Sequence, residues 1–183
     1  LTSIEALSSK ALFSKLISDI YRYISKSTDV KIRQWNTTRK VDTLYKKAKL
    51  IRQVKTIWQV DKAVDLYSFY CASNVIIDGE RKTINRFVDL GKEKRCVIEG
   101  IAGQGKSIFL RYLSAVELEL GEYFPVFIEL RRIDENNLLR SRIVTAFQAL
   151  GLSVDDRLFD ALARSGKVVL FLDAFDEIPD ELR

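Results

Sequence analysis

The residues with the clearest chemical meaning form the octapeptide GIAGQGKS, which runs from Gly100 to Ser107. Its spacing matches G-x-x-x-x-G-K-[ST], the pattern of a phosphate-binding P-loop. Glycines allow such a loop to wrap closely, so that successive backbone N–H groups point inward, and the following helix adds its positive N-terminal end. The lysine adds a full positive charge, and the serine hydroxyl can ligate Mg2+. We therefore predict that the loop binds a nucleoside triphosphate, ATP or GTP, together with Mg2+.

All eight loop residues are predicted to bind the nucleotide, with Lys106 at the β- and γ-phosphates and Ser107 at the metal. They are Gly100, Ile101, Ala102, Gly103, Gln104, Gly105, Lys106 and Ser107. The alternative is a chance match in a glycine-containing turn. The apolar run Cys96-Val97-Ile98 before the loop and the amphipathic segment after it argue against chance, because a P-loop needs a strand before it and a helix after it.

A second group of candidate residues lies at the acidic end of the apolar run VVLFLDAFDEIP. Asp173 is expected at the tip of a buried strand, where its carboxylate can join the Mg2+ shell as a Walker B aspartate. Asp176 and Glu177 are the candidate catalytic residues, because one carboxylate must orient or deprotonate the water that attacks the γ-phosphate. The competing interpretation is an ordinary strand that ends in a solvated acidic turn, and the P-loop favours the functional one.

The segments around these residues alternate between strand-like runs and amphipathic helices, which is typical of parallel strands joined by helical crossovers. The expected strands are RCVIEG, YFPVFIEL and KVVLFLD. The helix after the P-loop should end at Gly121, and the second crossover should hold one helix ending at Gly151 and another running from a cap at Ser153 to Gly166. We predict an α/β fold, with part of the parallel three-layer sheet of a P-loop NTPase in residues 95–183.

Helices are expected to dominate residues 1–60, because no glycine or proline occurs before Gly79 and apolar residues recur at helical spacing. One apolar stripe comprises Phe13, Ile17, Ile20 and Ile24, with Leu12 and Leu16 beside them, and the other comprises Val41, Leu44, Ala48, Ile51, Val54 and Trp58. Residues 61–94 form the expected connecting segment, in which Asp78-Gly79 turns a β-hairpin. The chain is thus predicted to divide into regions 1–60, 61–94 and 95–183.

The charge is unevenly distributed, since residues 1–60 hold 13 Lys or Arg against 4 Asp or Glu. The second predicted helix should therefore carry a basic face, made of Lys46, Lys47, Lys49, Arg52 and Lys55.

The composition, 47% hydrophobic and 30% charged over 183 residues, is that of a core-forming globular protein. No apolar run approaches the roughly 20 residues that cross a bilayer, and no signal peptide opens the chain, so we expect a cytoplasmic protein without membrane contacts. Cys71 and Cys96 are expected to be core thiols. The start at Leu1 and the absence of methionine suggest part of a longer protein.

Three stretches together carry a resemblance to a known family: VIEGIAGQGKSIFLRYL, PVFIELRRI and VVLFLDAFDE. They resemble a NACHT-type NTPase of the STAND class, chiefly because a tiny residue follows the predicted Mg2+-binding Asp173 and an acidic pair comes one residue later. The resemblance implies a nucleotide-dependent signalling switch that is inactive with ADP and self-associates with ATP. It also implies ATP hydrolysis in the full-length protein and, in bacteria, a role in defence against phage.

Two other functions are alternatives for this sequence. The basic helices of residues 1–60 could attract phosphate backbones, which would make the chain a nucleic-acid-binding protein with an associated P-loop ATPase. A metabolic P-loop kinase is the third alternative, but the sequence marks neither an acceptor pocket nor a lid. Arg131 and Arg132 follow the second predicted strand and are interpreted as surface charges rather than as an arginine finger.

Overall fold

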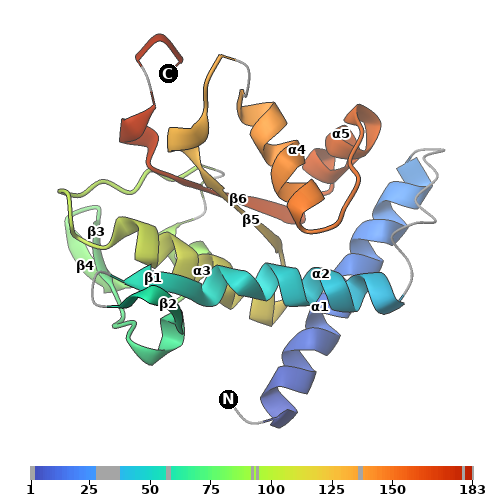
Figure 1. Cartoon of the computed structure of the whole chain (residues 1–183), viewed down its shortest axis with the longest axis horizontal. Coiled ribbons are helices and arrows are strands. Elements are labelled where there is room, and N and C mark those ends of the chain that lie inside the picture. The colour runs from blue at the N-terminus through green and yellow to red at the C-terminus, as the bar shows by residue number, and fades with distance from the viewer. Residues whose placement is uncertain are drawn as a thin grey trace.

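The computed structural model describes residues 3–27, 38–56, 59–91, 93, 95–135, 138–178 and 180–182, and it has a mixed α/β fold. The helices of the described part are α1 (Ser3–Ser27), α2 (Thr38–Ala48), α3 (Lys106–Leu120), α4 (Leu139–Ala149) and α5 (Asp156–Arg164). The strands are β1 (Gln53–Thr56), β2 (Gln59–Asp65), β3 (Asn74–Ile77), β4 (Glu80–Thr83), β5 (Phe124–Glu129) and β6 (Val168–Asp173). Figure 1 shows β5 and β6 at the centre, with the two hairpins at one end.

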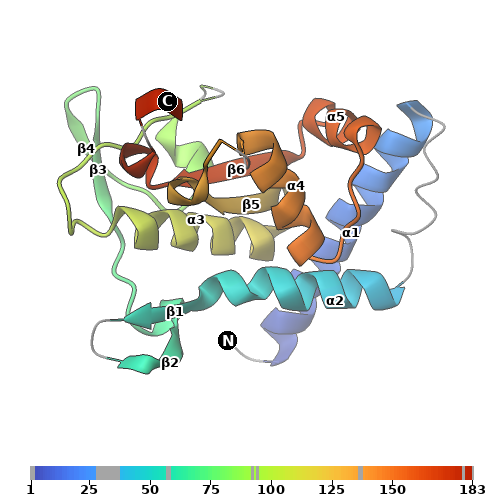
Figure 2. The same ribbon diagram turned by 45° about the horizontal axis from the view of Figure 1, so that its top comes forward.

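The parallel pair β5–β6 organises the fold, with Phe124 opposite Val168 at one end and Glu129 opposite Asp173 at the other. Because side chains alternate along a strand, each strand serves two faces. Phe127 and Phe171 pack with Phe109 and Leu113 of α3 on one face. The side chains of Phe124, Val126 and Ile128 join a larger cluster that includes Ile143 and Phe147 of α4. Figures 1 and 2 accordingly show α3 and α4 on opposite sides of the pair.

The first predicted strand, RCVIEG, is not a strand in the structure. Within the described part of the chain, residues 95–100 have no ladder partner. Ile98 packs against the cluster of Phe109 and Phe171, whereas Val97 is 81% exposed. The segment therefore lies against the core without joining a sheet, because a strand exists only where a neighbouring backbone completes its hydrogen bonds. In the described part of the chain, the parallel sheet of residues 95–183 therefore consists of β5 and β6.

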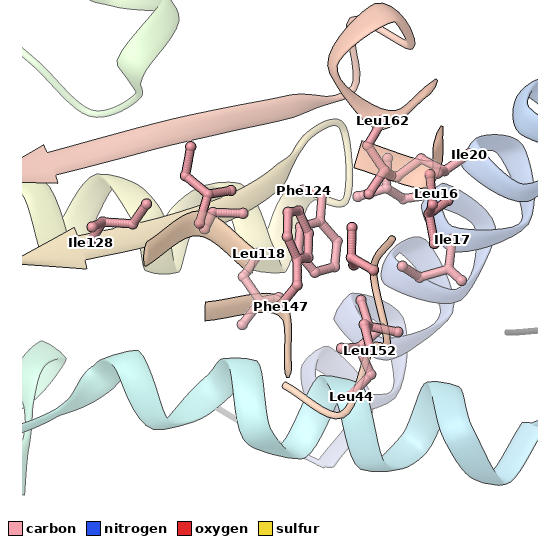
Figure 3. Close-up of a cluster of buried hydrophobic side chains, with 14 of the residues drawn as sticks. Leu16, Ile17, Ile20, Leu44, Leu118, Phe124, Ile128, Phe147, Leu152 and Leu162 are labelled. Atoms are coloured by element: carbon pink, nitrogen blue, oxygen red, sulfur yellow. The ribbon is translucent and has the colours of Figure 1, made fainter. Parts of the chain in front are cut away.

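Helix α1 belongs to the main hydrophobic core, as its predicted apolar stripe requires. Its buried residues pack with side chains of β5, α4 and α5, and Figure 3 shows Leu16 and Ile20 gathered with Leu162, near Phe124. The backbone of α1 also approaches the end of α3, since a Cβ placed on Gly121 would lie 2.5 Å from the carbonyl carbon of Leu12. Gly121 (φ 63°) ends α3 as predicted, for both steric and conformational reasons.

The second predicted helix ends earlier than its apolar spacing suggested. Helix α2 stops at Ala48, a 3-10 turn runs to Arg52, and residues 53–56 form β1, which pairs with β2. Val54 is buried, but on a strand opposite Val64 rather than on a helix. Strand pairing has overridden the helical period, as tertiary context commonly does. Trp58, the last residue of the predicted stripe, lies outside the described residues.

The predicted hairpin at Asp78-Gly79 is present, formed by β3 and β4. Both turn residues have positive φ, 53° and 81°, as a type I′ turn requires. The cap predicted at Ser153 is wrong by two residues: α5 is capped by Asp155, whose carboxylate accepts a hydrogen bond from the Leu158 N–H at 2.8 Å.

Both cysteines are exposed, so the prediction of core thiols is wrong. Cys96 lies on the segment 95–100 that stays outside the sheet, and exposure follows from that position. Among the described helices, none is both long and apolar enough to cross a bilayer.

Candidate functional site

The GIAGQGKS segment forms a loop that leads into α3, as the P-loop pattern predicts. Gly103 and Gly105 have φ values of 81° and 79°, in the left-handed region that glycine adopts without strain. Gly105 is the N-cap of α3, and its carbonyl accepts the hydrogen bond of the Phe109 N–H at 2.9 Å. The loop therefore delivers Lys106 and Ser107 as the first two residues of the helix.

Gln104 gives the loop its internal support. Its Oε1 accepts a hydrogen bond from the Ile101 N–H at 3.0 Å, and its own N–H donates to the Ile101 carbonyl at 3.4 Å. A Cβ on Gly100 would collide with this side-chain oxygen, so a larger residue there would displace the exposed Gln104 side chain from its bond to Ile101. Ile101 is 74% exposed, and Ala102 is also exposed.

Lys106 folds back over the same loop. Its Nζ donates to the carbonyl oxygens of Gly100 at 2.7 Å and of Ile101 at 3.1 Å. The ammonium group thus lies against the loop at the N-terminal end of α3, and both the helix end and the lysine favour an anion.

The most specific contact of the site joins the two predicted motifs. The Ser107 hydroxyl donates a hydrogen bond of 2.9 Å to Oδ1 of Asp173, a residue 66 positions later in the chain. Asp173 is the last residue of β6 and is only 9% exposed. The tertiary structure therefore brings together the two side chains that were predicted to ligate Mg2+.

The acidic turn follows directly on Asp173. Ala174 has φ 60°, one of two non-glycine residues in the described part with positive φ, and this left-handed residue turns the chain sharply away from β6. The short 3-10 helix Phe175–Glu177 places Asp176 and Glu177 on the surface at this edge. The structure brings these two residues to the end of the strand that carries Asp173, and their catalytic role stays a prediction.

One part of this edge was missed by the sequence reading. Glu129, the register partner of Asp173, accepts a hydrogen bond of 3.0 Å from Arg111, which lies one turn after Ser107 on α3. Arg131 and Arg132 also pair with Glu129. The available signal was the i, i+4 spacing of Ser107 and Arg111 together with the acidic ends of two neighbouring strands.

The predicted basic face does not lie on one helix, because Lys49 and Arg52 fall in the 3-10 turn and Lys55 falls on β1. Arg52 is 7% exposed and forms ion pairs with Asp65 at 2.6 Å and Glu119 at 2.8 Å, with its guanidinium 4.0 Å from the centre of the Tyr67 ring. Burial by itself would raise the pKa of Asp65, but the hydrogen bonds from Arg52 and the Tyr67 N–H outweigh it and the pKa is lowered. Arg52 therefore stabilises the fold, while Lys46 and Lys47 remain exposed.

Comparison with known proteins found no matching family model, curated protein or solved structure. In the described part of the chain, no group of three or more His, Cys, Asp and Glu side chains is arranged to hold a metal ion.

Proposed function

We propose that this chain binds ATP or GTP with Mg2+ at residues 100–107 and Asp173, as the nucleotide site of a cytoplasmic signalling switch of the NACHT/STAND type. The observation that carries the proposal is the 2.9 Å hydrogen bond from Ser107 to Asp173. A chance glycine turn has no reason to place its serine against the carboxylate that ends a distant strand.

The chemistry of the site supports the same ligand. Lys106 can exchange its two loop carbonyls for phosphate oxygens, which are negatively charged and therefore bind its ammonium group more strongly than neutral carbonyls do. The hydroxyl of Ser107 and the carboxylate of Asp173 are hard oxygen donors that suit Mg2+, an ion that takes its remaining ligands from phosphate and water. Such an ion would offset the charge of the phosphates at this edge.

The role of the bound nucleotide follows from the resemblance to NACHT proteins. The ATP state would favour self-association, and hydrolysis, aided by Asp176 or Glu177, would return the protein to its ADP state. The wider parallel three-layer sheet of a P-loop NTPase and a function in defence against phage belong to the same proposal.

The proposal is tested by titrating the chain with Mg-ATP and Mg-ADP in a calorimeter. Lys106→Ala should weaken binding of both nucleotides by at least about tenfold, because it removes charge-assisted hydrogen bonds to phosphate. Lys62→Ala, which removes an exposed lysine of β2, is the matched control and should bind like the parent. Equal affinity of the parent and Lys106→Ala would refute nucleotide binding at this loop.

The metal is tested separately with Asp173→Asn. This variant keeps the shape of the side chain and loses the charge, so its affinity for ATP should fall in Mg2+ and match that of the parent in EDTA. A loss of the same size in both buffers would mean that Asp173 acts on the fold and not through a metal ion.

A further inference from the structure

Three guanidinium groups converge on one carboxylate at the carboxyl end of β5. Arg111 contacts Oε1 of Glu129 at 3.0 Å, while Arg132 and Arg131 contact Oε2 at 2.9 and 3.4 Å. A single carboxylate can offset one of these three charges. The four side chains together therefore carry a formal charge of +2, and counting Asp173 as well leaves +1.

This group lies beside the proposed nucleotide site. Glu129 and Asp173 are register partners in a parallel pair, so their side chains project from the same face of the sheet. Their partners on α3, Arg111 and Ser107, are one helical turn apart and share a helix face. The contacts Ser107–Asp173 and Arg111–Glu129 are thus neighbouring links between the same helix and the same sheet edge.

The three arginines differ in how firmly they are held. Arg111 is 23% exposed and its guanidinium lies 4.5 Å from the centre of the Phe127 ring, which fixes it between α3 and the sheet. Arg132 is 62% exposed and bonds Glu129 through Nε, so that bond leaves both terminal nitrogens to meet another acceptor. Exposed ion pairs contribute little stability, and a guanidinium can bond phosphate oxygens as it bonds a carboxylate.

We propose that Arg132 contacts the terminal phosphate of the bound triphosphate and that Glu129 is the positioning residue that aims it there, itself held by Arg111. This inference rests on the proposed nucleotide site and gives that site a means to distinguish ATP from ADP. The ligand it recognises is a phosphate oxygen that a diphosphate lacks.

The experiment measures affinity for a non-hydrolysable ATP analogue and for ADP, both with Mg2+. Arg132→Gln should lower the affinity for the analogue by about tenfold, the value of a charge-assisted hydrogen bond, and change the affinity for ADP by less than about twofold. Arg131→Gln is the matched control, because Arg131 is also exposed but its contact with Glu129 is longer; it should leave both affinities within about twofold. Arg132→Lys keeps the positive charge but lacks the two-pronged guanidinium group, so it should lose less affinity for the analogue than Arg132→Gln does.

Glu129→Gln separates positioning from bulk charge. The substitution makes this edge of the sheet more positive, so a purely electrostatic effect would raise the affinity for the analogue. If Glu129 positions Arg132, the substitution instead lowers that affinity. We expect weakening for the analogue and little change for ADP. Tightening of the analogue, equal losses for both nucleotides, or equal effects of Arg131→Gln and Arg132→Gln would each overturn the inference. If the parent chain binds neither nucleotide, the proposed function fails with it.

Discussion

The carboxylate of Glu117 is fully buried on α3 and depends on one partner from the segment before the P-loop. Arg86 donates to both of its oxygens at 3.2 Å and also bonds Glu122 at 2.8 Å. Burial raises the pKa of Glu117, and the hydrogen bonds from Arg86 offset part of that rise. This ion pair ties Arg86 to α3, the helix that begins with Lys106 and Ser107 of the proposed nucleotide site.

Arg86→Met should lower the free energy of unfolding by about 3–5 kcal/mol at pH 7, because it leaves a buried charge without its partner. Without Arg86 the pKa of Glu117 rises further above its unfolded value, so the folded state binds a proton more tightly than the unfolded state. The deficit relative to the parent should therefore shrink as the pH falls from 7 to 5.

Urea unfolding at the two pH values measures this change. The variant Arg86→Met/Glu117→Gln, which carries no charge at either position, is the control and should show a pH-independent deficit. A deficit in Arg86→Met that is constant or grows toward pH 5 would contradict the assignment to Glu117.

At the scale of elements, the start of α5 shows how the tertiary structure can move a helix cap away from the residue that the sequence predicts. Ser153 and Asp155 are both exposed, and both belong to residue types that cap helices. In the structure Asp155 makes the capping bond to the Leu158 N–H, and Leu158 packs in the main core. The burial of Leu152 and Val154 fixes the chain before the helix and so decides which residue stands at the cap.

Asp155→Ala should lower the free energy of unfolding by about 1 kcal/mol, the usual value of an N-cap. Ser153→Ala, the matched control, should change it by less than about 0.5 kcal/mol. Thermal and urea unfolding of the two variants measure the difference. A larger loss for Ser153→Ala would mean that the helix begins where the sequence alone placed it.

Element types were predictable wherever the deciding signals lie close together in the chain. Gly105 and Gly121, which both have positive φ, mark the start and the end of α3, and Asp78-Gly79 forms the turn of the β3–β4 hairpin. Strand β1 was not predictable, because its pairing with β2 and the ion pair of Arg52 with Asp65 are tertiary contacts that a helical period cannot reveal. Residues 95–100 were wrongly predicted to form a strand, because apolar residues indicate burial but do not show whether another strand is available to pair with.

At the scale of the molecule, the N-terminal helices and the β5–β6 pair share one hydrophobic core. Phe13 of α1 lies 5.9 Å from Phe124 of β5 and 5.4 Å from Tyr45 of α2, measured between ring centres. Tyr23 of α1 donates a hydrogen bond of 3.1 Å to the Arg164 carbonyl at the end of α5. The predicted division at residues 60 and 94 stays a prediction, but these contacts indicate that the regions stabilise each other.

Phe13→Ala should lower the free energy of unfolding by about 3–5 kcal/mol, because it empties a buried aromatic site. Leu12→Ala, a neighbour that is 41% exposed, should cost about 1 kcal/mol or less and serves as the control. Unfolding followed both by helical signal and by nucleotide binding should show one shared transition that moves to lower urea. Two separate transitions, with only the helical one shifted, would mean that α1 unfolds independently of the proposed nucleotide site.

The sequence by itself determined the loop, its glycines, the helix that follows it and the acidic end of β6, because each depends on neighbouring residues and on backbone conformations that few residue types adopt. It also led us to predict Ser107 and Asp173 as joint Mg2+ ligands. Only the tertiary structure decided that these two side chains meet and that Glu129 stands beside them with three arginines. It also decided that Arg52 is buried, because such contacts join residues far apart in the chain and depend on which strands pair and which faces the helices cover.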